Sequence, residues 1–435
     1  MIGCTSFGTP RWSWYPLRAF RTYVGCFLKA TFSYSFSHTL ITRPQMEQQD
    51  LRALMPALAN KTYFNYGGQG PLPTPSLEAI TSTWGQIQEL GPFTGAVWPL
   101  IEGTTSRLRQ HLGQWFGVGT HRVAFSENVT TACVLPLWGL PWQTGDELLI
   151  SDCEHPGVVA ACHELARRHG LVITSLAVAD LRSDAPSAAM AVQGRLEAAL
   201  SPKTRLVVLS HLLWNTGQLM PIAAVADQLA GHPNHPYLLV DAAQSLGSIP
   251  VAEAAAAADI YGCTGHKWCC GPEGLGAMAL SERVLVEAQP TLIGWRSLSH
   301  ENQAGSGFHT DSRRFEVATS CIPLFAGLNS SLALLEAEGS AEQRHATITA
   351  LSHQLWEQLQ AVPGAQTLLQ TPPPAGLVSF TLERPAPEAV VAQLGAQGIW
   401  LRSLDDPHCL RACTHLTTTA ADISRLIEAL PGLAP

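Results

Sequence analysis

The stretch Ala258–Gly276, ADIYGCTGHKWCCGPEGLG, decides how the rest of the chain is interpreted. A single lysine, Lys267, stands among small, aromatic and sulfur-containing residues and is followed by three glycines. Cysteine and tryptophan prefer the protein interior, so a lysine flanked by them is not typical of a solvated surface. Burial lowers the pKa of a lysine and makes its amine nucleophilic near neutral pH. The alternative is an ordinary surface lysine after a turn.

A second motif, VDAAQSLG at Val240–Gly247, precedes the lysine. It begins at the end of a strand-like run and contains Asp241, and the spacing to Lys267 leaves room for a crossover and another strand. A lysine for a Schiff base and a buried carboxylate that keeps a proton on a pyridine nitrogen are what a pyridoxal 5'-phosphate (PLP) enzyme needs. Acids at strand ends also serve many other ligands in α/β proteins. Spacing and composition alone leave both interpretations of Lys267 open.

Bulk properties narrow the class of protein. The chain has 435 residues, 46% hydrophobic and 14% charged, enough for a large core and a second, smaller domain. The net charge of −8 provides no basic field for nucleic acid. No apolar run is long enough to span a bilayer. The eleven cysteines include no CxxC pair and no zinc spacing, so we expect no metal and a reducing compartment.

The first 45 residues differ from the rest. They contain arginines, a lysine and many Ser, Thr and aromatic residues, but no Asp or Glu, as in an organelle transit peptide. The other interpretation is a mis-assigned start, with Met46 as the first residue. Residues 1–45 are therefore treated as an extension outside the fold. The expected compartment is the cytoplasm, or a plastid if residues 1–45 are a transit peptide.

After this extension we expect an N-terminal helix over residues 46–61, packed on the small domain. Strands then alternate with helices, which predicts an α/β fold with a mostly parallel sheet in a large domain, residues 62–310. The small α/β domain covers residues 311–435, with the cleft between the two domains. The expected strands and helices of the large domain include Glu147–Ser151, Gly157–His169, Val172–Leu176, Met190–Leu200, Arg205–Ser210, Ala223–Ala230 and Leu238–Val240.

Two loops offer backbone to a ligand. Gly67, Gly68 and Gly70 allow close backbone approach. The turn Ser126–Thr131 lies between a strand and a helix start, where N–H groups and hydroxyls suit a phosphate. An ordinary helix cap would give the same pattern.

With these motifs in this order, the chain resembles fold-type I PLP enzymes, and most of all the class V aminotransferase family, which holds cysteine desulfurases, kynureninase and cystine lyases. TGHKWCCGPEGLG, from Thr264, is similar to the family's lysine motif, and DAAQS, from Asp241, to its aspartate and glutamine motif. The resemblance covers roughly Thr62 to the C-terminus.

The resemblance implies a role for each matching residue. Lys267 would form the Schiff base with PLP and act as acid and base on the substrate. Asp241 would pair with the pyridinium nitrogen, Gln244 would bind the phenolic oxygen, and His155 in SDCEHPGVV would stack on the ring. The residues that would hold the phosphate are Val129, Thr130, Thr264, His266 and, from the neighbouring subunit, Thr319. That last contact implies a homodimer with shared active sites.

Within the family, the chain is most similar to the L-cysteine/cystine C–S lyase branch. The shared traits are FNYGGQGPLP, DCEHPG, SHLLWNTGQ and LRSLDDPHCLRAC. Desulfurases usually carry an Asn where Trp214 stands, and Asn215 comes one place later. The resemblance therefore implies β-elimination from L-cystine or L-cysteine, giving pyruvate, ammonia and a persulfide or sulfide. It also suggests sulfur supply to an acceptor protein and to iron–sulfur clusters.

Two arginines are the candidates for the substrate carboxylates. Arg402 and Arg411 flank a short loop, and a guanidinium binds a carboxylate with two parallel hydrogen bonds. Gly67 and Gly68 are expected beside the substrate. A surface ion pair is the alternative for either arginine.

Other activities stay open at this point. A desulfurase would form alanine and a protein persulfide, and it needs a cysteine in a recognisable mobile loop, RxGHHCA or a Ser-Gly-Ser-Ala-Cys type. Neither loop is present, and Cys409 lies between the two arginines. An amino-acid epimerase shares the first proton removal. A catalytically inactive binding protein of the same fold is the non-enzyme alternative.

Overall fold

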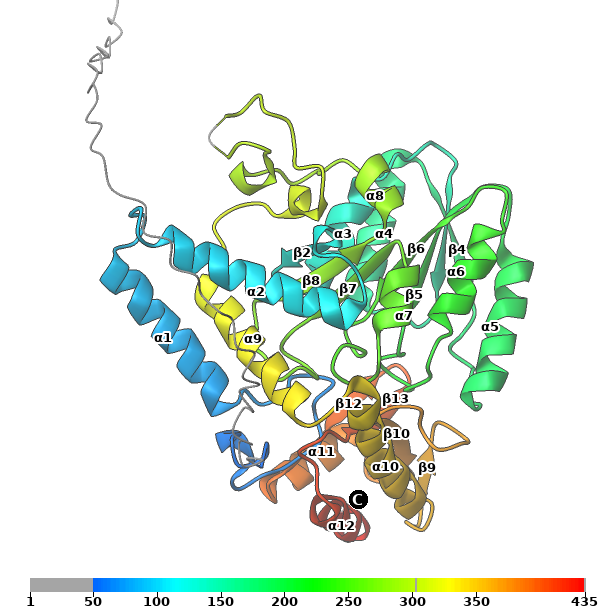
Figure 1. Cartoon of the computed structure of the whole chain (residues 1–435). Coiled ribbons are helices and arrows are strands. Elements are labelled where there is room, and N and C mark those ends of the chain that lie inside the picture. The colour runs from blue at the N-terminus through cyan, green and yellow to red at the C-terminus, as the bar shows by residue number, and fades with distance from the viewer. Residues whose placement is uncertain (1–49, 302, 434–435) are drawn as a thin grey trace, which may run out of the picture. The chain divides into compact units, whose positions relative to one another are not determined.

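A seven-stranded sheet forms the centre of the computed structural model, which describes residues 50–301 and 303–433 (Figure 1). Its strand order is β2-β8-β7-β6-β5-β3-β4, and the strands from β7 to β4 run parallel. The antiparallel strand β8 joins β7 to β2. The strands are β2 Val123–Ser126, β3 Glu147–Ser151, β4 Val172–Leu176, β5 Thr204–Ser210, β6 Tyr237–Asp241, β7 Ile260–Thr264 and β8 Gly276–Leu280. This is the mixed α/β fold that the strand–helix alternation predicts.

Helices cover both faces of this sheet because its strands are apolar on both sides. In β5, Leu206 and Val208 belong to one core cluster, whereas Val207 and Leu209 belong to the other, as the period of two in a strand requires. The first face packs against α3 Val129–Trp138, α4 Pro156–His169 and α8 Glu282–Glu287. The second packs against α2 Trp98–Phe116, α5 Ala185–Ala199, α6 Ile222–Ala230, α7 Ala252–Ala257 and α9 Ile322–Ala337. Helix α1, Thr74–Leu90, lies along α9 (Figure 1).

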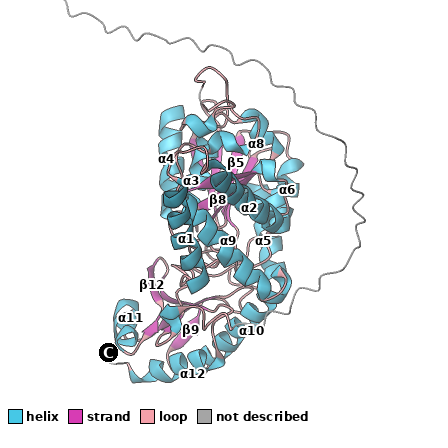
Figure 2. Ribbon diagram, turned by 60° about the vertical axis from the view of Figure 1, so that its left-hand side comes forward, coloured by secondary structure: helices cyan, strands magenta, loops and turns pink. Residues whose placement is uncertain are grey.

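A separate core of buried apolar residues packs against a four-stranded sheet of order β12-β13-β10-β9 (Figure 2). The strands and helices of this body are α10 Ala341–Leu359, β9 Ala365–Thr367, β10 Leu377–Leu382, α11 Pro387–Ala396, β11 Ile399–Trp400, β12 Arg402–Asp405, β13 His408–Cys413 and α12 Ala420–Ala429. The N-terminal strand β1, Thr62–Tyr63, joins this body by pairing in parallel with β11. The expected division at residue 310 stays a prediction.

The helix expected over residues 46–61 is wrong for the described part of that range. Residues 50–61 form turns and one short 3₁₀ helix, Pro56–Leu58. Pro56 has no N–H to donate and excludes a continuous α-helix at this point. Arg52 instead reaches Asp422 of α12 at 2.9 Å. The expectations for residues 1–45 and for Met46 lie outside the described residues.

Smaller differences concern where elements begin and end. The helix expected from Met190 begins at Ala185, because Asp184 accepts the Ser187 N–H at 2.9 Å and caps it. The single strand that the pattern over Ile399–Ser403 predicts is divided into β11, Ile399–Trp400, and β12, which Arg402 opens. Among residues 50–301 and 303–433, no helix is long and apolar enough to cross a membrane.

Candidate active site

The carboxyl ends of the parallel strands meet at one edge of the large sheet, and the predicted residues gather there. Asp241 is the last residue of β6, and its register partner in β7 is Gly262. Lys267 follows β7 by three residues, and His155 follows β3. In open α/β sheets ligands bind at this edge. Strand order therefore brings together residues that are far apart in the sequence.

The Lys267 side chain is half-buried in the loop after β7. Burial lowers the pKa of its amine to about 8, and the nearby Arg411 and Arg402 charges act in the same direction. The Asp241 charge opposes this shift. Near neutral pH the amine is therefore neutral and nucleophilic far more often than that of an ordinary lysine.

Asp241 has a buried carboxylate, 5% exposed. It accepts the Ala243 N–H at 2.9 Å, and burial raises its pKa against the opposing charges of Lys267 and His155. A buried carboxylate is costly unless a cation pairs with it. The protonated nitrogen of a pyridine ring would supply such a cation, so this position fits the expected cofactor.

The Gln244 side chain is held by two neighbours. Its Nε2 donates to the Gly67 carbonyl at 2.9 Å, and its Oε1 accepts the Trp268 indole N–H at 2.9 Å. A carboxamide carries two N–H bonds, so one remains for a ligand oxygen. The predicted contact with the phenolic oxygen is compatible with this geometry and stays a prediction.

The predicted phosphate site lies at the start of α3. Asn128 caps this helix by accepting the Thr131 N–H at 3.0 Å, so Val129 and Thr130 form its first turn. Sheet register places Ser126, Gly276 and Thr264 side by side on β2, β8 and β7. A Cβ on Gly276 would lie 2.9 Å from the Asn128 carbonyl carbon, so glycine allows this close approach.

Thr264 ends β7 beside Gly276, which approaches that helix start, and His266 follows two residues later. The Thr264 hydroxyl and His266 Nδ1 are 2.7 Å apart. Burial lowers the pKa of His266, and the positive charge of Lys267 adds to the effect. A helix N-terminus suits a phosphate, and hydroxyl and imidazole groups can add hydrogen bonds to it.

His155 is exposed and caps α4, where its Nδ1 accepts the Gly157 N–H at 3.3 Å. Its ring meets the Trp214 ring edge to face, with centroids 5.9 Å apart. Burial of part of the ring lowers its pKa, while Asp241 raises it and Lys267 and Arg402 lower it. These interactions place the imidazole in the same electrostatic environment as Lys267, with an open side for a stacked ring.

The two predicted substrate arginines lie side by side on neighbouring strands of the small sheet. Arg402 of β12 and Arg411 of β13 are register partners, so their side chains share one face. Arg411 is 1% exposed, and its Nη1 donates to the Trp214 carbonyl at 2.7 Å. Its Nε and Nη2 are buried and have no hydrogen-bond partner within the described part of the chain. Buried donors left unpaired are costly, which favours an anionic ligand here.

The glycine loop closes over this constellation. A Cβ on Gly67 would lie 2.9 Å from Arg411 Nη2, and one on Gly70 would lie 2.2 Å from the Lys267 carbonyl oxygen. The Gly70 N–H also donates to the His266 backbone carbonyl at 2.8 Å. Only glycine lets the backbone approach Lys267 and Arg411 this closely. At Gly68 a Cβ would instead meet Asn65, so that glycine serves the turn.

Comparison with known proteins identifies the family. The profile of the family described as "Aminotransferase class-V" matches residues 101–426. The chain belongs to this family. It is 43% identical to the solved structure of the cystine C–S lyase C-DES in complex with its reaction product cysteine persulfide, with a TM-score of 0.83, covering 88% of this chain and 100% of that chain. A C-DES mutant with glycine covalently linked to the PLP cofactor superposes with the same TM-score at 42% identity, covering 88% of this chain and 99% of that one.

Curated relatives carry two further activities in their names. Isopenicillin N epimerase from Streptomyces clavuligerus is 28% identical, covering 85% of this chain and 94% of the relative. A probable cysteine desulfurase from Methanothermobacter thermautotrophicus is 25% identical, covering 89% and 98%. The expected family and the expected transferase fold are thus confirmed.

Thr319 is exposed and lies in the loop before α9. It lines a hollow of about 300 Å³ together with Ser126 and Glu127, the residues just before the α3 cap. Its contact with the phosphate of a second subunit stays a prediction.

Cys409 is fully buried in β13, opposite Leu404. Burial raises the pKa of its thiol to about 11. A thiol that attacks sulfur must be accessible and ionised. Its position therefore does not favour the role that a desulfurase would give it.

Several residues of the site were not singled out in the sequence. Glu154, next to His155, is buried and bridges β3 and β5 by accepting bonds from Ser151 at 2.5 Å and from the Ser210 N–H at 2.7 Å. Ser379 of β10 donates to the Asn215 carbonyl at 2.6 Å and is the register partner of Arg411. The acidic residue within DCEHPG was a usable signal for Glu154, whereas Ser379 stands in a run with no motif.

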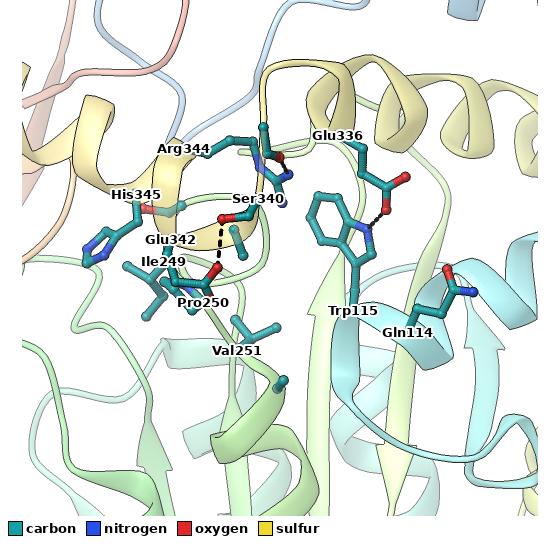
Figure 3. A pocket seen from close by; sticks show the side chains of 15 residues that line it. Gln114, Trp115, Ile249, Pro250, Val251, Glu336, Ser340, Glu342, Arg344 and His345 are labelled. Atoms are coloured by element: carbon teal, nitrogen blue, oxygen red, sulfur yellow. Dashed lines mark hydrogen bonds between the residues drawn. The ribbon is translucent and has the colours of Figure 1, made fainter. Parts of the chain in front are cut away.

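A separate hollow of about 310 Å³ lies between α2, residues 247–252 and the corner of α9 and α10 (Figure 3). Trp115 donates its indole N–H to Glu336 at 2.7 Å, and the Arg344 guanidinium lies 4.8 Å from the Trp115 ring centre (Figure 3). Ser340 and Glu342 hydrogen-bond each other at the start of α10. These groups satisfy one another, and none of the predicted site residues lines this hollow.

Proposed function

We propose that this protein is a PLP-dependent carbon–sulfur lyase that converts L-cystine, and less efficiently L-cysteine, into pyruvate, ammonia and a persulfide or sulfide. The observation that carries the proposal is that a nucleophilic lysine lies near a buried guanidinium whose hydrogen-bond donors are incompletely satisfied. The positive charge of Arg411 lowers the pKa of Lys267, and Arg411 Nε and Nη2 have no hydrogen-bond partner among the described residues. The similarity to C-DES supports the choice of sulfur amino acids.

The residues at the sheet edge fit PLP. Asp241 would face the pyridinium nitrogen, the start of α3 with Thr264 and His266 would hold the phosphate, and His155 would cover the ring. When bound, PLP supplies an electron sink that stabilises negative charge at the substrate α-carbon.

Lys267 is the group that would move the proton. With a pKa of about 8, its amine can accept the proton of the substrate α-carbon near neutral pH. Arg411 would meanwhile hold the carboxylate and fix the orientation of that C–H bond. As the proton leaves, the β-carbon–sulfur bond breaks and its electron pair departs with sulfur.

The leaving group determines the substrate preference. With cystine the departing group is cysteine persulfide, whose conjugate acid is stronger than that of a simple thiol, so cystine should react faster than cysteine. The remaining three-carbon enamine takes up water and gives pyruvate and ammonia, which balances the reaction.

We infer further that the protein acts as a homodimer. Large apolar side chains are exposed on α1 and in the segments after it and before α9, namely Leu77, Trp84, Leu90, Phe93, Leu292 and Ile293. Exposed apolar side chains of this size favour burial in an interface. Thr319 of one subunit would then reach the phosphate of the other, and a sulfur acceptor protein would take the persulfide, with iron–sulfur assembly as one use.

The deciding experiment is product analysis with purified, PLP-loaded protein and L-cystine, with pyruvate and alanine measured together. We expect pyruvate with ammonia and a persulfide, and unchanged products from Cys409→Ala. Alanine as the main product, lost in Cys409→Ala, would instead establish a desulfurase. Racemised substrate without sulfur release would establish an epimerase.

A further inference from the structure

Trp268, the residue that follows Lys267, is fully buried and contacts the predicted cofactor site through Gln244. Its indole Nε1–H donates to Gln244 Oε1 at 2.9 Å, and Gln244 is itself buried. The carboxamide Nε2 of Gln244 donates to the Gly67 carbonyl at 2.9 Å. Gln244 therefore lies between a group that can only donate and a group that can only accept a hydrogen bond.

These two bonds decide which way the carboxamide of Gln244 points. An indole N–H cannot accept and a backbone carbonyl cannot donate, so the amide oxygen must face Trp268 and the amide nitrogen must face Gly67. In the reversed orientation the NH2 group would meet the Trp268 N–H, and the amide oxygen would meet the Gly67 carbonyl. The two neighbours thus fix the orientation by their chemistry alone.

The position of Trp268 is set by contacts other than Gln244. Its backbone carbonyl accepts a hydrogen bond from His415 Nε2 at 3.1 Å, and burial lowers the pKa of His415 to about 4, so this imidazole is neutral near pH 7. A Cβ on Gly376 would lie 2.9 Å from Trp268 Cζ3, and one on Gly247 would lie 2.7 Å from the Trp268 carbonyl carbon. Backbone therefore packs directly against both the ring and the main chain of Trp268, which makes its indole a fixed donor.

The fixed orientation leaves one N–H of Gln244 for a ligand. Nε2 carries two N–H bonds, of which one goes to Gly67, and the other has no acceptor within residues 50–301 and 303–433. The phenolic oxygen of PLP bears negative charge near neutral pH and would accept this bond. A reversed carboxamide would present its oxygen there, and two buried oxygens that face each other without a proton are costly.

We propose that Trp268 is a positioning residue, whose indole N–H holds the Gln244 carboxamide with its free N–H toward the phenolic oxygen of PLP. A tryptophan that only fills the core would have no such effect on the cofactor. The inference rests on the contacts that the proposed function gives to the PLP site, and not on the reaction proposed there. Binding measurements can therefore test it separately.

The test compares PLP with 3-deoxypyridoxal 5'-phosphate, which keeps the aldehyde, the ring nitrogen and the phosphate but lacks the phenolic oxygen. The PLP-loaded full chain is equilibrated with increasing amounts of the analogue, and the PLP released gives the ratio of the two dissociation constants. This ratio is the preference for PLP. In Gln244→Ala the preference should fall about tenfold, as for the loss of a hydrogen bond to a charged group.

Trp268→Phe keeps an aromatic ring and removes the N–H. We expect its preference for PLP to fall about threefold or more, because Gly67 alone then orients the carboxamide. Combined with Gln244→Ala, this change should cause no further loss, since Trp268 acts through Gln244. A residue that only packs would weaken the binding of both cofactors alike and leave the ratio unchanged.

Two further variants separate this effect from damage to the fold. Trp268→3-benzothienylalanine keeps the size of the indole and replaces its N–H by sulfur, so it should give the same ratio as Trp268→Phe. Trp356→Phe in α10 removes an indole bond to the Leu369 carbonyl, 3.0 Å long, and should retain the wild-type ratio.

The outcomes separate the two levels of the argument. If Gln244→Ala keeps the wild-type ratio, the predicted contact of Gln244 with the phenolic oxygen fails, and the inference fails with it. If Gln244→Ala lowers the ratio, but the variants at Trp268 leave it unchanged or add their loss to that of Gln244→Ala, the inference alone is overturned. Losses that are not additive would support it. Failure of the lyase proposal would appear in the product analysis with cystine and not in these ratios.

Discussion

At Lys267, two opposing electrostatic effects decide reactivity. Burial and the neighbouring arginines lower the pKa to about 8, whereas Asp241 raises it. We expect Lys267→Ala to lose the PLP that remains attached to wild-type protein after borohydride reduction and denaturation. Absorbance and mass spectrometry of the denatured chain measure this directly. Lys203→Ala on the exposed surface is the control, and an unchanged yield of attached cofactor in Lys267→Ala would contradict the assignment.

The carboxylate binding expected of Arg411 depends on the shape of its guanidinium group as well as on its charge. Its Nη1 is occupied by the Trp214 carbonyl, and its two unpaired nitrogens form a planar fork. Arg411→Lys retains the charge and loses the fork, so KM for cystine should rise roughly 10- to 100-fold, with a smaller change in kcat. Steady-state kinetics measures the split, with Arg195→Lys on the surface as control. An unaffected KM would mean that the carboxylate is held elsewhere.

Glu154 makes the stability of the folded protein depend on pH. Burial raises its pKa from 4.5 to about 7, with Asp241 acting in the same direction and bonds from Ser151 and Ser210 opposing it. The folded state therefore retains a proton between pH 4.5 and 7 that the unfolded chain releases, so this contribution to stability is present below pH 4.5 and lost as pH rises through 7.

It follows that Glu154→Gln should gain stability over wild type as pH increases. The difference in free energy of unfolding should grow by on the order of 1–3 kcal/mol between pH 5 and 8. Urea denaturation at a series of pH values measures it, with exposed Glu357→Gln as reference. Parallel curves for wild type and Glu154→Gln would refute this account of the buried carboxyl group.

At the level of elements, the start of α3 serves both folding and cofactor binding. Asn128→Ala removes the cap on Thr131, which should cost about 1 kcal/mol of stability and also weaken PLP binding. Thermal unfolding and PLP titration measure the two effects. Asp184→Ala removes the comparable cap of α5, away from the site, and should lower stability alone. Equal PLP affinity in both variants would argue against phosphate binding at α3.

Local sequence patterns predicted the helices and strands well where the residues of the element alone determine its structure. The strand Glu147–Ser151 has the expected bounds, and Lys267 and Asp241 lie at the same sheet edge because each follows a parallel strand. Patterns failed where contacts between distant segments decide. Asn215 and Ser379 meet across 164 residues, and nothing in either local sequence announces that bond.

For the whole molecule, the exposed apolar side chains make association the main question. Phe93 is 84% exposed, and Leu77 and Trp84, seven residues apart, share one side of α1. We expect the pair of changes Trp84→Asp and Phe93→Ser to convert a dimer to a monomer and to weaken PLP binding through loss of Thr319. Light scattering with PLP titration tests both, and Met190→Asp, also on an exposed apolar residue, is the control. A wild-type monomer would remove the basis for a shared site.

The pairing of β1 with β11 also bears on when activity arises during synthesis. Thr62 pairs with Ile399, and the Phe64 carbonyl accepts from the Cys413 N–H, so β1 is anchored by residues that are translated much later. Contacts of such long separation in sequence form late. While the ribosome is still adding the final strands, Lys267 has been made, but the Gly67–Gly70 loop has no anchor and Arg411 is absent. A growing chain therefore carries its reactive amine before the arginine expected to select the substrate has been made.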